Sequence, residues 1–71
     1  MTKKYWQGTP PAKCDMDDVP IVNIFYDAKT TIGPWGCLCP ACFVRYGIGL
    51  GLGLGQQYEK QPDGKWLKTG D

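Results

Sequence analysis

The sequence predicts a small α+β domain in which a β-hairpin and one short helix are followed by a C-terminal β-hairpin. Segments rich in β-branched and aromatic residues flank clusters of turn residues, which is typical of hairpins. Pro40 begins a segment that suits a helix, because proline fits the first helical position. The chain also carries four cysteines in 71 residues. A core of that size contributes only about 3–5 kcal/mol of stability, so we expect a cross-link or a bound metal ion to hold the fold.

A metal ion is the better candidate for that role. The first residues are polar and lack the apolar stretch of a signal peptide, so we expect a protein of the reducing cytoplasm. The apolar runs are too short to cross a membrane. The net charge of +1 argues against a dedicated DNA-binding domain, whose affinity depends on excess Lys and Arg.

Residues 19–38 predict the first hairpin. Strand-forming side chains favour a strand that starts at about Ile21 and ends at Tyr26. Residues 27–34 contain turn residues, and residues 35–38 can return as the second strand.

Residues 40–47 predict the helix. Pro40 occupies its first position, and Gly47 suits a left-handed residue that ends it. Cys39 precedes the helix and Cys42 lies in its first turn, where the positive end of the helix dipole favours ionised, metal-binding thiolates.

Residues 47–55 alternate strictly between glycine and an aliphatic residue. In an extended conformation the aliphatic side chains share one face, which we interpret mainly as a face that completes the core. The alternative is a surface for a partner. The glycines predict a close approach of the backbone to an aromatic ring of the same chain or to a partner.

Residues 57–68 predict the C-terminal hairpin, with its bend at Pro62, Asp63 and Gly64. Tyr58 and Trp66 alternate there with lysines. Two interpretations remain open: an aromatic contact between the strands with solvated lysines around it, or a binding surface.

Residues 1–13 read as a flexible, basic and aromatic arm, and residues 14–71 as one small zinc-finger-like domain. Pro10 and Pro11 exclude a regular helix in the arm. Tyr5 and Trp6 are expected to dock on the body of the domain, with a stacking or partner-anchoring surface as the alternative.

The predicted metal ligands are Cys14, Asp17, Cys39 and Cys42, and structural zinc is the expected ion. In a second version Cys37 replaces Asp17, although Cys37 and Cys39 would point to the same side of an extended strand. In a third version no metal binds and the thiols are packed or redox-active.

Two resemblances follow from these motifs. The order of cysteine turn, hairpin, cysteine turn and helix over residues 14–47 resembles the treble-clef zinc finger. The chain also resembles a group of small tailed-phage proteins of unassigned function in which Asp17 would be a cysteine. The segments that carry this second resemblance are Phe25-Tyr26-Asp27-Ala28-Lys29-Thr30, Gly33-Pro34-Trp35, Cys39-Pro40-Ala41-Cys42, Gly49-Leu50-Gly51, Gly55-Gln56-Gln57-Tyr58 and Asp63-Gly64-Lys65-Trp66.

The expected function is that of a noncatalytic interaction protein, because histidine is absent and a closed zinc site has no free coordination position. We expect a monomer without membrane contact. The phage resemblance implies that it lies in the host cytoplasm and binds and redirects a host machine, with RNA polymerase the first candidate. Direct RNA or DNA binding is the alternative, and a thiol oxidoreductase that uses Cys39 and Cys42 is the second alternative. The candidate partner-binding residues are Lys3, Lys4, Tyr5, Trp6, Lys13, Arg45, Tyr58, Lys60, Lys65, Trp66 and Lys68.

Overall fold

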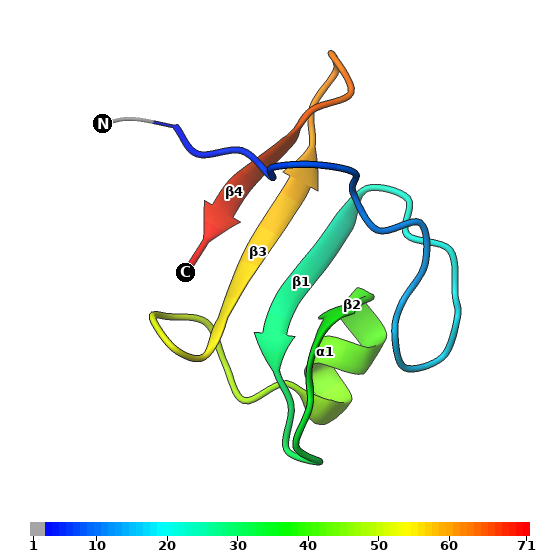
Figure 1. Ribbon diagram of the computed structural model, residues 1–71, viewed down its shortest axis with the longest axis vertical. Coiled ribbons are helices and arrows are strands. Elements are labelled where there is room, and N and C mark those ends of the chain that lie inside the picture. Colours follow the sequence, from blue (N-terminus) through cyan, green and yellow to red (C-terminus); the bar gives the residue numbers. More distant parts are fainter. Residues whose placement is uncertain (1–2) are drawn as a thin grey trace.

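A computed structural model describes residues 3–71 and confirms the α+β class (Figure 1). One antiparallel sheet has the strand order β2-β1-β3-β4. The elements are β1 (Ile24–Lys29), β2 (Trp35–Leu38), α1 (Pro40–Tyr46), β3 (Gly55–Lys60) and β4 (Trp66–Gly70). No helix among the described residues is long and apolar enough to span a membrane.

The two predicted hairpins are confirmed, and the first strand differs from its predicted bounds. β1 begins at Ile24 and continues to Lys29, through residues expected to form a turn. It is paired on both edges, with β2 and with β3, and these two sets of hydrogen bonds hold Asp27 and Ala28 in the extended form. Ile21 instead donates its N–H to the carbonyl of Ala12, 3.0 Å away, so that segment follows the N-terminal arm.

The pairing of β3 with β1 joins the two hairpins into one sheet. Phe25 lies opposite Tyr58 in this register. The sequence predicted no pairing between the two hairpins. In the structure β1 is a central strand that is covered on both faces.

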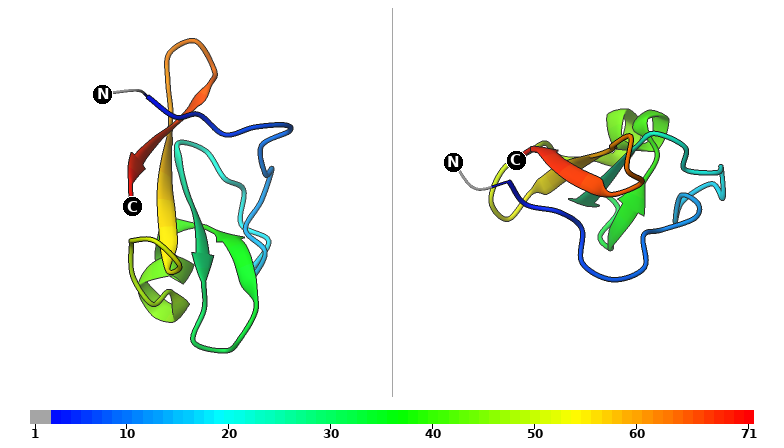
Figure 2. Two further views of the ribbon diagram at one scale, coloured as in Figure 1. Left: turned by 60° about the vertical axis from the view of Figure 1, so that its left-hand side comes forward. Right: turned by 90° about the horizontal axis from the view of Figure 1, so that it is seen from above.

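Two separate cores lie on the two faces of the sheet. The metal-side core lies under the helix and contains Cys14, Ala28, Leu38, Cys39 and Cys42. The aromatic-side core contains Phe25, Tyr58 and Trp66, with Trp6 packed against them. Figure 2 shows the helix and the N-terminal arm on opposite sides of the sheet.

The helix starts at Pro40 as predicted, but its end is not left-handed. Gly47 has φ −69° and ψ 150°, which is extended backbone open to any residue. Glycine is needed there for space, because a Cβ at this position would lie 2.5 Å from Cδ1 of Phe43. The expected close approach of a glycine to an aromatic ring is therefore present at Gly47.

The Gly-Leu loop, residues 48–54, is neither extended nor buried, so the prediction of a core-completing face is wrong. Gly51 and Gly53 have φ of 134° and 79°, and these left-handed conformations break the two-residue alternation. Gly51 and Gly55 exchange backbone hydrogen bonds that close a tight turn. Leu52 at its tip is 98% exposed.

The N-terminal arm docks on the edge of the sheet at Tyr5 and Trp6. The N–H of Trp6 donates to the carbonyl of Trp66, and the N–H of Lys68 donates to the carbonyl of Lys4. The Trp6 ring meets Phe25 edge-on with centroids 5.2 Å apart. The expected docking of the two aromatic residues is thus confirmed, and the part of the predicted arm at residues 1–2 lies outside the described residues.

Candidate metal centre

Four side chains with possible metal-ligand atoms come together where the turn at residues 14–19 lies against the start of α1. Cys14, Asp17, Cys39 and Cys42 each offer one ligand atom, and these atoms all lie within 4.8 Å of one another. The three cysteines are buried, while Asp17 is exposed at the rim. The four residues of the first predicted ligand set are therefore the ones that the fold brings together.

The first pair of ligands sits on a tight knuckle at residues 14–19. Asp18 donates its N–H to the carbonyl of Cys14, and Met16 donates its N–H to the Cys14 sulfur, 3.4 Å away. The Asp17 carboxylate accepts the N–H of Val19 at 3.1 Å. These bonds turn the Cys14 sulfur and the Asp17 carboxylate towards the helix.

The second pair comes from the helix start. Cys39 is the N-cap residue, and its carbonyl accepts the N–H of Phe43, which begins the helical ladder. Cys42 Sγ lies 3.2 Å from Asp17 Oδ2, and Cys39 Sγ lies 3.7 Å from the same oxygen. The two halves of the site are already in contact through that carboxylate.

The electrostatics of the group favour a cation at its centre. The N–H of Val19, followed by the Cys42 thiol, lowers the pKa of Asp17, so this carboxylate is charged at neutral pH. Burial, followed by the hydrogen bond to Asp17, raises the pKa of Cys42 above its usual range. A divalent ion would reverse this effect, since metal coordination deprotonates a thiol.

Cys37 does not belong to the site. It packs on the aromatic-side core, whereas the next residue in β2, Leu38, faces the metal side. The expectation that Cys37 and Cys39 point to one side is wrong, because β2 ends at Leu38 and Cys39 already belongs to the helix cap. The version of the site with Cys37 as fourth ligand is therefore excluded by the geometry.

Asp15 is a supporting residue that the sequence analysis did not single out. Its N–H donates to the carbonyl of Cys37, and its carboxylate accepts the N–H of Cys37 at 2.8 Å. This pair fixes the knuckle to the outer edge of β2, next to Gly36. The contact spans 22 positions of sequence, so no local pattern could have indicated it.

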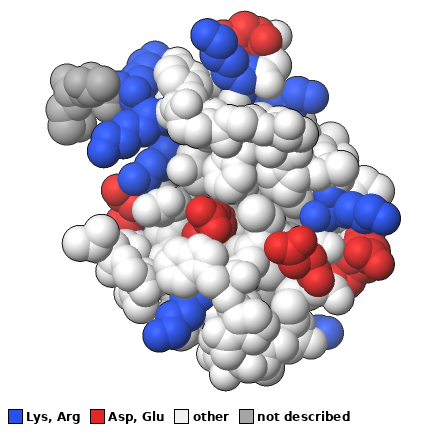
Figure 3. All heavy atoms as spheres, viewed as in Figure 1, with Lys and Arg blue, Asp and Glu red and all other residues white. Residues whose placement is uncertain are grey.

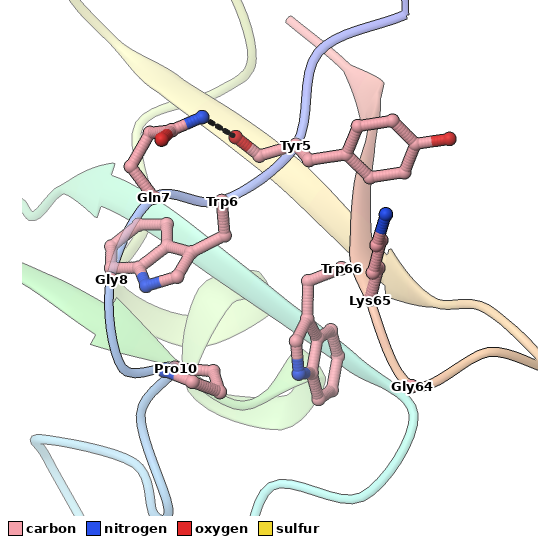
Figure 4. Close-up of a pocket in the computed structure, with 8 residues that line it drawn as sticks. All are labelled: Tyr5, Trp6, Gln7, Gly8, Pro10, Gly64, Lys65 and Trp66. Carbon is pink, nitrogen blue, oxygen red and sulfur yellow. Dashed lines mark hydrogen bonds between the residues drawn. The ribbon is translucent and has the colours of Figure 1, made fainter.

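The candidate partner-binding residues are divided among several regions. Tyr5, Trp6, Lys65 and Trp66 line one cleft (Figure 4). Lys3, Lys4 and Lys68 line a second hollow beside the C-terminal strand, and Figure 3 shows basic side chains gathered there. Two of the remaining candidates, Lys13 and Lys60, are exposed outside both clefts, and Arg45 lies over the ring of Tyr46 on the helix.

Tyr58 and Trp66 are mostly buried, and of the two only Trp66 also lines the cleft. Both belong to the aromatic-side core, where Phe25 stacks on Tyr58 with centroids 5.2 Å apart and meets Trp66 edge-on. Burial raises the pKa of Tyr58. These contacts agree with the interpretation of Tyr58 and Trp66 as an aromatic contact between strands. The two rings are linked by Phe25 of β1, which contacts both of them.

Comparisons with known proteins add no assignment: no protein-family model matches the chain, and neither a curated protein nor a solved structure matches it.

Proposed function

We propose that the protein is a noncatalytic interaction module whose fold is held by a structural zinc ion and which binds and redirects a host macromolecular machine, with RNA polymerase the first target to test. The observation that carries the zinc part is the convergence of the ligand atoms of Cys14, Asp17, Cys39 and Cys42 within 4.8 Å. Three sulfurs and one carboxylate oxygen form a set that zinc accepts in tetrahedral sites. The set is closed, which suits a structural ion.

The order of the ligands supports a treble-clef-like arrangement. The first two lie on the knuckle before β1, and the last two lie at the start of α1, directly after the β1–β2 hairpin. Zinc would then tie the knuckle to the helix, and its binding free energy would be added to the small contribution of the cores.

A thiol oxidoreductase is the less favoured alternative. Reactive thiols are partly exposed and have a lowered pKa. Cys39 and Cys42 are both buried, and the pKa of Cys42 is raised. Both thiols also point at Asp17, which would oppose a thiolate nucleophile by charge repulsion.

The Gly-Leu loop supports the interaction role. Ile48, Leu50, Leu52 and Leu54 are all exposed, and exposed aliphatic residues that follow one another on a small protein are typical of a contact surface. Glycines bring no side chain to shield them. An apolar loop of this kind would bind a protein groove better than it would bind phosphates.

Direct nucleic-acid binding is the second candidate function, and one observation supports it. Lys3, Lys4 and Lys68 line the same hollow, although Lys68 forms an ion pair with Asp71 at 3.2 Å. Affinity based on such lysines falls steeply with salt, whereas an apolar contact keeps most of its strength.

In the test, zinc-loaded protein is immobilised and incubated with purified, nuclease-treated bacterial RNA polymerase at about 50 and 300 mM salt. The zinc content is measured on the same sample. We expect about one zinc per chain and capture at both salt concentrations. Leu52→Ser should weaken capture, and Val44→Ser, a similar change at a site that is 84% exposed on α1, should not. Absence of capture at both salt concentrations would contradict the polymerase target. Binding of single-stranded DNA that disappears at the higher salt would favour the second candidate.

A further inference from the structure

A cleft of about 440 Å³ opens between the N-terminal arm and the β3–β4 turn. Figure 4 shows the indole rings of Trp6 and Trp66 and the ring of Pro10 around it, with Gly64 and Lys65 at the turn. The volume lies within the range of ordinary ligand sites. The β3–β4 turn and the arm, which line the cleft, lie towards the opposite end of the ribbon from the Gly-Leu loop (Figure 1), so the cleft is a separate surface.

The lining of this cleft includes polar side chains of Tyr5, Gln7 and Lys65, and the most buried of its polar side chains is the indole of Trp66. Trp66 is only 7% exposed, and its Nε1 has no hydrogen-bond partner among residues 3–71. In that part of the chain every fully buried side-chain nitrogen and oxygen has a partner, so Nε1 keeps some exposed surface. Figure 4 places this nitrogen on the ring edge that faces Pro10.

The other two tryptophans differ in this respect. The indole N–H of Trp6 donates to the carbonyl of Thr9 at 3.1 Å, and that of Trp35 donates to the Asp27 carboxylate at 2.7 Å. A buried tryptophan normally finds such a partner. The N–H of Trp66 is therefore, among the indole donors of residues 3–71, the one left available to an acceptor from outside the described chain.

A ligand that fits this cleft would have a carbonyl acceptor for the Trp66 N–H and rigid apolar groups that pack on the rings. A proline-rich peptide in the polyproline II conformation has both, because its backbone makes no internal hydrogen bonds and its rings pack against aromatic side chains. Its conformation is fixed before binding, so little entropy is lost.

The charge around the cleft disfavours a nucleic acid. Lys65 is the single basic residue in the lining, and its Nζ lies 5.8 Å from the centre of the Tyr5 ring. Asp63 lies in the same turn, where its carboxylate accepts the N–H of Lys65. Binding to a nucleic acid rests on several phosphate contacts, and a carboxylate beside one lysine opposes them.

We propose that the cleft between Trp6, Pro10 and Trp66 binds a proline-rich, extended segment of a partner protein, with the Trp66 indole N–H donating to a peptide carbonyl. The proposal rests on the interaction role and gives it one partner chemistry. Polymerase capture is tested through Leu52 and peptide binding through Trp66, so each proposal can fail without the other.

The test is a titration of ¹⁵N-labelled, zinc-loaded protein with decaproline, followed through the three indole N–H signals. We expect the Trp66 signal to move with saturation and the Trp35 signal to stay in place. A glycine-serine decapeptide should move neither. Trp66→Phe keeps an aromatic ring without the donor and should weaken binding about tenfold, whereas Trp35→Phe is the matched control and should bind as the unchanged protein does.

Three results would overturn the proposal. The first is a Trp66 signal that does not respond to decaproline at millimolar concentration. The second is Trp66→Phe binding with undiminished affinity. The third is a Trp66 signal that responds to decathymidine and not to decaproline, which would make the cleft a stacking site for single-stranded nucleic acid. The first and third results are read on the unchanged protein, so they do not depend on the stability of the variant.

Discussion

The two faces of the sheet are held together by different forces. On the metal side three of the five buried residues are cysteines, and the only large side chain among the five is Leu38. On the aromatic side Phe25, Tyr58, Trp66 and the docked Trp6 bury large rings, each of which removes roughly 150–250 Å² from water. The aromatic side is therefore stabilised mainly by burial, while the metal side gathers three thiols and a carboxylate that could bind a cation.

β1 connects the two sides and makes them dependent on each other. Phe25 points into the aromatic-side core, while Tyr26 and Ala28 face the metal side, where Tyr26 stacks on Phe43 with centroids 4.0 Å apart. A small domain can in this way use one strand for two cores, each too small to fold alone.

The largest expected effect comes from removing the ion or a buried ligand. Chelation, or Cys42→Ser, should unfold the domain, because structural zinc contributes on the order of 10–16 kcal/mol in comparable small sites. Circular dichroism melts with and without chelator would measure it. A metal-free protein that still melts cooperatively at the same temperature would contradict the dependence of the metal side on coordination.

Phe25→Ala should have the next largest effect. Phe25 is fully buried at the centre of the aromatic side, and such a truncation costs about 3–5 kcal/mol. We expect a lower midpoint of unfolding in denaturant. When cobalt replaces zinc as a probe, the absorption bands of cobalt bound to thiolates should be unchanged in the folded protein. Loss of those bands at the same time would show that the two sides cannot be separated.

Asp17→Cys should increase the affinity of the metal side for zinc. A fourth thiolate is a softer ligand than the exposed carboxylate, so we expect at least about tenfold tighter zinc binding. Competition with a coloured chelator would measure the change. Asp17→Asn, which keeps an oxygen but not the charge, is the control and should bind more weakly; equal affinity in all three proteins would mean that Asp17 is not a ligand.

Cys37 provides a pH-dependent test of the aromatic side. Burial raises the pKa of this thiol from its usual 9.0 to about 11. Because the unfolded thiol ionises first, its contribution to stability is complete below pH 9 and is lost as the pH rises to about 11. Thermal melts should show a small loss of stability as the pH rises from 8 to about 11. This pH-dependent loss should be smaller in Cys37→Ser. An alkylation rate like that of a free thiol at pH 8 would contradict the raised pKa.

Leu52→Ser should have the smallest effect on folding. The side chain is almost fully exposed, and such surface changes are worth less than about 0.5 kcal/mol. A larger shift in the denaturation midpoint would mean that the Leu52 side chain packs on the domain in solution.

Local sequence was sufficient for the hairpins, the helix and the knuckle. The turn at Gly64, with φ 87°, and the helix start at Pro40 follow from the backbone preferences of those residues. The spacing of Cys39 and Cys42 also predicted half of the metal site. The Gly-Leu loop was mispredicted because its alternation was read as burial, although glycines with positive φ let the chain turn instead.

The sequence by itself determined which residue types could bind a metal and where strands and the helix form, because both depend on neighbours along the chain. Only the tertiary structure decided that β3 pairs with β1, that Asp17 and not Cys37 joins the other three ligands, and that Trp66 is buried with its N–H at a cleft. These outcomes depend on which face of a shared sheet each side chain occupies, and that face is fixed by contacts between distant segments.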